Sequence, residues 1–323
     1  MSDLFKTQHK VTQGECDAYA RSLTKSSVTP VPWQGFHSYT LLSASGIIVQ
    51  FRSEASPLNS STVKIAKAIH GHVAPTTTYH GSIPNSSITI WVMEALPGTG
   101  YLFTASSLTL AKQDAIITDL AKFYAKSWRN PQTPITDKQH LYDTKLKKLL
   151  YALPARFTPV IEQIQSRIAE TIDQVPWVLT HKDLSNMNIL VDPDSGHLTG
   201  VVDWADATIE PFGIALWGLE SVLGCSGPGG WSYFGHDPSH SRLLFRQAFL
   251  AEIGETLSDQ TCRAIDEVRA LGILLRYGFT WETGVEKPVE DTSLLDVFLG
   301  SELMQMVTEF GSYESREGGL SNE

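Results

Sequence analysis

The sequence has few cysteines, no signal-like start and no long apolar run. Three cysteines among 323 residues are odd in number and widely spaced, which excludes a disulfide framework, and none has metal-site spacing. The first residues lack the basic and apolar regions of a secretion signal, and no apolar run reaches the roughly 20 residues of a membrane span. These absences predict a cytoplasmic protein with reduced thiols and no membrane partner.

Basic residues are also scarce relative to acidic ones. The formal net charge is −10, and no basic run is longer than Lys145 to Lys148. Because nucleic-acid affinity comes largely from Lys and Arg on phosphates, a nucleic-acid partner is excluded, and a cationic or neutral small molecule fits better. No Walker loop GxxxxGK[ST] is present. The 42% hydrophobic and 19% charged residues are ordinary for a globular protein with a sizeable core.

Residues 180–207 carry two polar patterns between short apolar strands. HKDLSNMN, residues 181–188, fits H-x-D-L-x-x-x-N, the catalytic loop of protein kinases, in which the Asp takes a hydroxyl proton and the Asn holds magnesium. Asp203 closes the apolar strand 198–202, and a hairpin with strand 189–191 would return this second acid to the loop. The two patterns together predict two acids and an amide around one cavity.

This set of side chains is the one that phosphoryl transfer needs. The reaction requires an oriented hydroxyl and cations that neutralise phosphate charge. Asn188 and Asp203 offer hard oxygen ligands for magnesium, which leaves Asp183 as the base. Taken singly, either pattern is equally well explained by ordinary turn residues. Their joint occurrence at this spacing favours metal-assisted phosphoryl transfer.

HKDLSNMNILVD and GVVDWADA resemble the aminoglycoside phosphotransferase and choline kinase group, whose members read approximately HGDLxxxNILV and GxIDWxxA. The resemblance implies a two-lobed, protein-kinase-like α+β fold that uses ATP and Mg²⁺. Asp183 would then be the catalytic base, Asn188 and Asp203 the metal ligands, and His181 a structural support. Lys182 replaces the usual Gly, where it would contact phosphate or point to solvent. The segments GFHSYT and IVQFR are similar to fungal members of the group, which favours specialised metabolism over drug resistance.

The resemblance also divides the chain into lobes. Residues 1–95 are expected to form the N-lobe, a small antiparallel sheet with a nucleotide-covering turn, and residues 96–310 a larger, mostly helical C-lobe. Residues 311–323 are expected to be a disordered tail. Apolar periodicity places strands at 39–42, 47–51, 76–79 and 88–93, and helices at 58–70, 141–150, 160–172, 212–223, 241–253, 258–277 and 294–310, together with a long helix that ends at Trp128 and is capped by Ser107 or Thr109.

Candidate nucleotide-binding residues lie along the expected N-lobe. Gly35 and Ser38 precede the first two strands, where a glycine-containing turn would cover the phosphates, although a plain turn glycine fits equally well. Arg52 ends a strand where kinases place a phosphate-binding Lys. WVMEALPG resembles the hinge of the group, so that backbone of Glu94 and Leu96 would bind adenine with Met93 behind the ring.

Two features depart from a standard kinase. The helix 58–70 contains no acid to pair with Arg52, which leaves Glu54 as the only nearby candidate, so that ion pair is expected to be absent or rerouted. The Gly-rich segment that follows residue 223 is rich in aromatics. Two interpretations of this segment are equally good. It either determines substrate specificity, with Trp231, Tyr233 and His236 as candidate substrate residues, or it is an aromatic-rich surface loop.

The sequence therefore predicts a small-molecule kinase that transfers the γ-phosphoryl of ATP to a hydroxyl of a small metabolite. Two alternatives remain open. One is a nucleotide- or small-molecule-binding protein that kept the fold and lost phosphotransfer. The other is an ATP-independent enzyme that uses Asp183 as an acid or base.

Overall fold

The computed structural model describes residues 11–135, 138–235, 237–282 and 285–300, without the side chains of residues 281 and 282. The chain forms two compact units. Unit 1 comprises residues 1–104 and 187–207, and unit 2 comprises residues 105–186 and 208–323. The lobe boundary after residue 95 stays a prediction. The expected tail, residues 311–323, lies outside the described residues, as do residues 301–310 of the last expected helix. Within the described residues that helix, expected at 294–310, ends already at Phe298.

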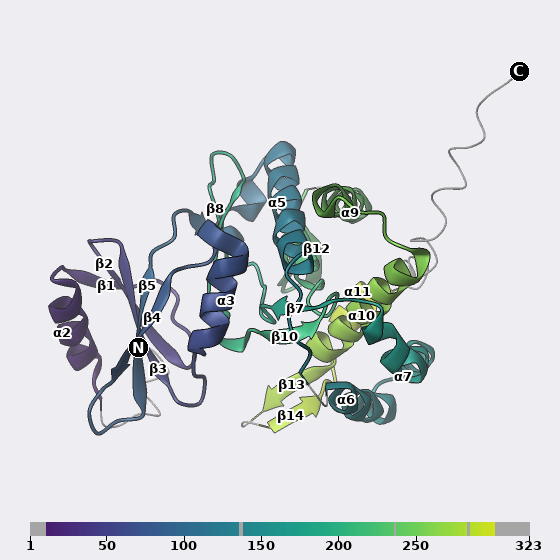
Figure 1. Ribbon diagram of the computed structural model, residues 1–323, viewed down its shortest axis with the longest axis horizontal. Coiled ribbons are helices and arrows are strands. Elements are labelled where there is room, and N and C mark those ends of the chain that lie inside the picture. Colours follow the sequence, from purple (N-terminus) through teal and green to yellow (C-terminus); the bar gives the residue numbers. More distant parts are fainter. Residues whose placement is uncertain (1–10, 136–137, 236, 283–284, 301–323) are drawn as a thin grey trace, which may run out of the picture. The chain divides into compact units, whose positions relative to one another are not determined.

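Unit 1 contains a five-stranded antiparallel sheet in the order β1-β2-β3-β5-β4. Helix α2 (Gln13–Thr24) begins with a capping box between Thr12 and Glu15 and lies beside β1 and β2 (Figure 1). Its buried face packs on apolar side chains of the central strands, which forms the core of this sheet. The strands are β1 (Val28–Pro30), β2 (Ser38–Ser43), β3 (Ile47–Ser53), β4 (Thr77–Ser82) and β5 (Ile88–Glu94).

A second, smaller sheet completes unit 1. It has the order β6-β8-β9 and is antiparallel, with β6 at Thr99–Gly100, β8 at Ile189–Val191 and β9 at Leu198–Val201. The 3₁₀ turn η1 (Gly71–Val73) contacts β9, and helix α4 (Tyr101–Thr104) contacts β6 and β8. Helix α3 (Ser60–His70) contacts η1 and the 3₁₀ turn η4 (Trp204–Asp206). The β8–β9 hairpin predicted from the sequence is therefore present, and it carries the two predicted metal ligands at its open end.

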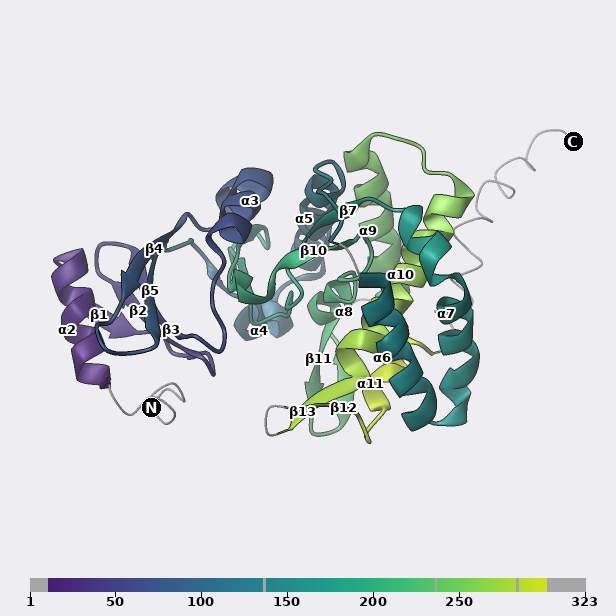
Figure 2. The same ribbon diagram turned by 60° about the horizontal axis from the view of Figure 1, so that its bottom comes forward.

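Unit 2 is mostly helical, and α10 is its central helix. Cys262 and every residue from Ala264 to Leu274 of α10 are buried, because α7, α11 and the segment around Ile214 all pack on this helix. Helix α5 packs on α9, and α6 runs beside α7 (Figure 2). The helices are α5 (Leu110–Trp128), α6 (Lys138–Ala152), α7 (Thr158–Asp173), α8 (Gly218–Leu223), α9 (Pro238–Ile253), α10 (Asp259–Tyr277) and α11 (Ser293–Phe298).

Three two-stranded sheets and two 3₁₀ turns complete unit 2. They are β7 (Trp177–Thr180) with β10 (Thr208–Pro211), β11 (Gly224–Gly227) with β12 (Gly230–Tyr233), β13 (Phe279–Glu282) with β14 (Val285–Pro288), and the turns η2 (Ala105–Ser107) and η3 (Ala155–Phe157). The aromatic segment after residue 223 is thus a β-hairpin, and the expected helix 212–223 is formed only from Gly218 onward.

The architecture confirms the expected α+β class, with an antiparallel sheet in the N-terminal unit and a mostly helical C-terminal unit. Among the helices that the structure describes, none is both long and apolar enough to cross a membrane.

Candidate active site

The loop that carries Asp183 begins where β7 ends. His181 is buried, and its Nδ1 accepts a hydrogen bond from the backbone N–H of Asp183 at 3.3 Å. Lys182 has φ = +61°, in the left-handed region that a non-glycine residue seldom occupies. The group's pattern has Gly at this position, and the backbone here keeps the conformation that Gly favours. The Asp183 side chain is 35% exposed, so the predicted base is accessible within unit 2.

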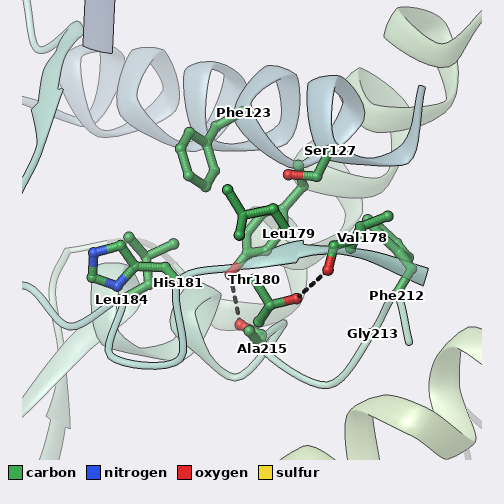
Figure 3. Close-up of a pocket in the computed structure, with 11 residues that line it drawn as sticks. Phe123, Ser127, Val178, Leu179, Thr180, His181, Leu184, Phe212, Gly213 and Ala215 are labelled. Carbon is green, nitrogen blue, oxygen red and sulfur yellow. Dashed lines mark hydrogen bonds between the residues drawn. The ribbon is translucent and has the colours of Figure 1, made fainter. Parts of the chain in front are cut away.

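A small cavity lies behind this loop (Figure 3). Phe123 and Ser127 of α5 lie on one side of it and Leu179 of β7 on the other, and its volume is about 10 Å³, room for roughly one water molecule. Tyr124 closes one side by donating a hydrogen bond from its hydroxyl to the carbonyl of Ala215 at 2.6 Å. Burial raises the pKa of this Tyr124 phenol. The cavity is too small for a metabolite and belongs to the packing that fixes β7.

An arginine that sequence reasoning missed contacts the predicted base. Arg276, in the last turn of α10, donates from Nη2 to Asp183 Oδ1 at 3.0 Å. Its guanidinium carbon lies 4.9 Å from the centroid of the Trp217 ring, which is buried. The only sequence signal was a basic residue at a helix C-terminus, where such residues are common for reasons of helix dipole alone.

Lys182 is held by an acid of β10. Glu210 is 2% exposed and accepts hydrogen bonds from Lys138 Nζ at 2.8 Å and from the Tyr142 hydroxyl. It also forms an ion pair with Lys182, whose Nζ lies 3.5 Å from Glu210 Oε1. Burial, and then the Glu210 carboxylate, raise the pKa of Tyr142. The Lys182 ammonium is therefore part of an ion-pair network that fixes the loop to β10.

The predicted metal ligands lie together at one end of the β8–β9 hairpin in unit 1. The carbonyl of Asn188 accepts from the N–H of Val202 at 2.9 Å, so Asn188 and Asp203 end two paired strands. Asp203 has φ = +60° and a side chain that is 42% exposed. Trp204 anchors the turn, since its Nε1 donates to the carbonyl of Val201 at 2.9 Å.

Arg52 reaches Asp203 across unit 1. Its side chain is 3% exposed, and Nη1 donates to Asp203 Oδ1 at 3.2 Å and to Gln50 Oε1 at 2.9 Å. Ser56 accepts from Nε through its carbonyl at 2.9 Å and from Nη2 through its hydroxyl at 2.8 Å. The acidic partner of Arg52 among the described residues is Asp203, and neither α3 nor Glu54 supplies one. The ion pair is rerouted, as the absence of an acid in residues 58–70 led us to expect.

The oxygen donors of Asn188 and Asp203 fit a magnesium ion. Magnesium uses one or two protein oxygens together with water and phosphate oxygens, and it does not require a closed protein cage. In the described part of the chain, no group of three or more His, Cys, Asp or Glu side chains is arranged to hold a metal. A site built on one amide and one carboxylate therefore suits a metal that arrives with a phosphate ligand.

Gly35 and Ser38 form a turn before β2. The N–H of Ser38 bonds the carbonyl of Gly35 at 3.4 Å, and a Cβ added to Gly35 would lie 2.5 Å from the Ser38 hydroxyl. A residue with a side chain at position 35 would thus displace Ser38. Ser38 itself is buried and pairs with Arg52 in the β2–β3 ladder, which ties this turn to the arginine.

The predicted hinge is fixed at both ends within unit 1. Met93 and Glu94 end β5, and the Glu94 carboxylate accepts from Lys67 Nζ at 3.1 Å and from the N–H and hydroxyl of Thr76 at 3.2 and 3.0 Å. The hydrogen bond from Lys67, followed by those from Thr76, lowers the pKa of Glu94. Leu96 packs so closely on Gly200 of β9 that a Cβ there would lie 2.8 Å from Leu96 Cδ1.

The candidate substrate residues lie on the β11–β12 hairpin of unit 2. The Trp231 ring packs edge-on against Phe298 at 4.8 Å, and the Tyr233 hydroxyl accepts from Arg242 Nη2 at 3.2 Å. Both side chains thus have structural contacts in unit 2. His236 lies outside the described residues.

The candidate residues divide between the units. Unit 2 contains the predicted base Asp183, its predicted support His181 and the candidate substrate residues Trp231 and Tyr233. Unit 1 contains all predicted nucleotide and metal residues: Gly35, Ser38, Arg52, Met93, Glu94, Leu96, Asn188 and Asp203.

Several solved structures share the fold of this chain. Among solved structures, a GDP complex of an aminoglycoside 2′-phosphotransferase-IIIa variant shares 16% identity, with 95% of this chain and 99% of that chain covered and a TM-score of 0.54. A putative aminoglycoside phosphotransferase from Ralstonia eutropha JMP134 shares 14% identity, with 93% and 98% covered and a TM-score of 0.54. The ADP-bound aminoglycoside phosphotransferase APH(2″)-Ib shares 16% identity, with 93% and 99% covered and a TM-score of 0.50.

These similarities concern the fold, which they confirm as that of the kinase-like aminoglycoside phosphotransferases. None of the curated proteins compared with the chain matches it. The family model described as the phosphotransferase enzyme family matches residues 55–226, a stretch that includes α3, the hinge, the Asp183 loop and the β8–β9 hairpin. Since this match covers more than half of the 323 residues, the chain belongs to the phosphotransferase enzyme family.

Proposed function

We propose that this protein transfers the γ-phosphoryl group of ATP to a hydroxyl of a small molecule, with magnesium. The observation that carries the proposal is the β8–β9 hairpin, which holds Asn188 and Asp203 at one end directly after the loop of Asp183. Family membership supports the same reaction class. The roles of the individual residues are part of the proposal.

In this mechanism Asp183 accepts the proton of the acceptor hydroxyl as its oxygen attacks phosphorus. The hydrogen bond from the Asp183 N–H to His181 and the contact with Arg276 orient the carboxylate. Asn188 and Asp203 hold magnesium, which neutralises phosphate charge when bound. Arg52, buried and fixed by Ser56, supplies a further positive charge for the phosphates from a position that costs little reorganisation.

The nucleotide is bound by backbone rather than by side chains. The carbonyl of Glu94 and the N–H of Leu96 pair with the adenine edge, and the contacts of Glu94 with Lys67 and Thr76 keep that segment in place. The structures of similar fold that contain GDP and ADP support the use of a nucleotide. We propose ATP as the donor in a cytoplasmic setting, and GTP is the alternative to measure in parallel.

The first experiment measures the melting temperature with and without magnesium-ATP. At a ligand concentration of 100 times Kd, binding adds about 2.7 kcal/mol to the free energy of unfolding. We expect this stabilisation in the wild type and its loss in Asp203→Ala. The matched control is Asp194→Ala, because Asp194 lies in the exposed turn at the other end of the same hairpin. Equal stabilisation of wild type and Asp203→Ala would contradict the assignment of Asp203 as a metal ligand.

The second experiment separates binding from catalysis. Asp183→Asn is expected to keep the magnesium-ATP stabilisation and to lower kcat by a factor on the order of 10² to 10⁴, the usual contribution of a positioned base. An unchanged kcat in Asp183→Asn would contradict the role of Asp183 as the catalytic base.

One observation favours the alternative of a nucleotide-binding protein without phosphotransfer. The Arg52 guanidinium engages Asp203, the acid that a metal would require. In that case magnesium-ATP stabilises the protein without turnover of any acceptor. An ATP-independent enzyme, in contrast, shows no stabilisation by magnesium-ATP at all.

A further inference from the structure

The Arg276 guanidinium is held in place beside the predicted base. It contacts the carboxylate of Asp183 at 3.0 Å, within unit 2, and the Trp217 ring supports its face at 4.9 Å. A guanidinium that is stacked on a buried ring and bonded at one end has lost most of its rotational freedom. It therefore needs little further ordering to bind a ligand.

The guanidinium retains unused donors. Its side chain is 43% exposed, and apart from the bond to Asp183 it donates to none of the described residues. Arginine presents five N–H donors in a planar fork that matches a carboxylate. The remaining donors thus lie beside the base, open to a small molecule whose hydroxyl is bound at Asp183.

Nearby carboxylates are already neutralised. Glu220 is fully buried and bonded to Arg242 at 2.9 and 3.0 Å and to Arg269. Glu210 is buried against Lys138 and Lys182. Neither acid is available to a polycation, although the chain as a whole has a net charge of −10. The net charge of the whole chain had favoured a cationic or neutral acceptor. Around Asp183, in contrast, these two buried acids are already paired with cations and do not favour a cationic acceptor.

We propose that the acceptor is a hydroxy acid, in which Arg276 binds the carboxylate while Asp183 receives the hydroxyl proton. A monoanion fits better than a phosphate dianion, because Asp183 already balances part of the Arg276 charge. The inference rests on the proposed kinase function. In the reaction, the hydroxyl oxygen forms a bond to the γ-phosphorus, the bond from that phosphorus to the β,γ-bridging oxygen breaks, ADP leaves with the electron pair, and the proton goes to Asp183.

The test compares acids with matched neutral analogues. Glycerate, gluconate and shikimate are each assayed beside their primary amides, with kanamycin as a polycation and glycerol phosphate as a dianion. Wild type, Arg276→Gln, Arg276→Lys and Arg263→Gln are compared, the last being a control because Arg263 is an exposed arginine on the same helix. The readout is the ratio of kcat/KM for acid over amide, which a general loss of activity does not change.

In the wild type we expect at least one acid to be phosphorylated, with a ratio on the order of 10 to 100, the effect of one or two charge-assisted hydrogen bonds. The ratio should fall to near one in Arg276→Gln, remain partly in Arg276→Lys and be unchanged in Arg263→Gln. The inference is overturned if no acid is phosphorylated, if kanamycin, an amide or glycerol phosphate is preferred, or if Arg276→Gln keeps the acid preference.

The change in melting temperature caused by magnesium-ATP, measured on the same samples, distinguishes a failure of the kinase proposal from a failure of the hydroxy-acid proposal. A normal shift in wild type and in Arg276→Gln shows that the nucleotide site is intact, so failure of the acid preference then counts against the hydroxy acid alone. Absence of the shift in wild type refutes the kinase proposal, and it thereby also refutes the inference that the acceptor is a hydroxy acid.

Discussion

Glu220 is the position where a single-atom change is expected to have the largest effect on stability. The carboxylate is 0% exposed, and it accepts from Nε and Nη2 of Arg242 at 3.0 and 2.9 Å and from Arg269. Replacement by Gln keeps the size of the side chain but removes the negative charge and points an amide N–H₂ at guanidinium donors. Two arginine charges are then left buried without their acid.

Removing one partner of a buried ion pair costs about 3–5 kcal/mol. That is a large part of the roughly 5–15 kcal/mol by which proteins of ordinary stability stay folded. For compact units of this size we expect Glu220→Gln to lower Tm by roughly 6–20 °C. Urea unfolding followed by tryptophan fluorescence measures the same loss as a shift of the midpoint.

The matched control is Glu252→Gln. Glu252 pairs with Arg129 at 3.3 Å, but their side chains are 34% and 46% exposed, so its loss should cost less than about 1 kcal/mol. If Glu220→Gln lowers the free energy of unfolding by no more than Glu252→Gln does, then the buried arginine charges do not cost what we expect when their acid is removed. If unpaired charge is the cause, the triple change Glu220→Leu, Arg242→Met and Arg269→Met should be less destabilising than Glu220→Gln alone.

Three further predictions concern packing, pH and thiol reactivity. Gly272→Ala should lower the free energy of unfolding by about 3 kcal/mol, because the added Cβ collides with the backbone of Ile214, whereas Gly229→Ala meets nothing within 4 Å and should change it by less than about 0.5 kcal/mol in urea titrations. Burial raises the pKa of Asp266 well above its ordinary value, so the folded state keeps a proton that the unfolded state releases above about pH 4. Asp266→Asn should therefore raise the free energy of unfolding at pH 7, and the gain should shrink as the pH falls toward 4; no gain at pH 7 would contradict this. Burial raises the pKa of the Cys16 thiol to about 12, so a thiol reagent at pH 8 should label the half-buried Cys225 first and Cys16 only on unfolding, as peptide mapping would show.

The elements that sequence reasoning found are those set by local pattern. The β8–β9 hairpin follows from two short apolar runs with turn residues between them, and α5 follows from its apolar stripe. The family and the α+β fold were predicted from the Asp183 and Asp203 patterns and are confirmed. The roles of Asp183, Asn188 and Asp203 in catalysis stay predictions.

The features that sequence reasoning missed depend on contacts between distant residues. Arg276 lies 93 positions from Asp183, and nothing local distinguishes it from other arginines near helix ends. The β11–β12 hairpin was not expected because its strands are rich in Gly and Ser, residues that seldom form strands. Glu210 and Glu220 looked like ordinary acids, since only the fold shows that they are buried against cations.

The boundary between the two units falls inside a single loop, between Asn186 and Met187. The residues proposed to bind the nucleotide and the metal thus pack in one unit, and the proposed base packs in the other. Leu184, fully buried in unit 2, leaves no room for a side chain at Gly218, whose added Cβ would lie 3.1 Å from the Leu184 carbonyl. Substitutions confined to unit 2 would change none of the residues proposed to bind the nucleotide, so the proposed mechanism allows the acceptor to change while the phosphate donor stays the same.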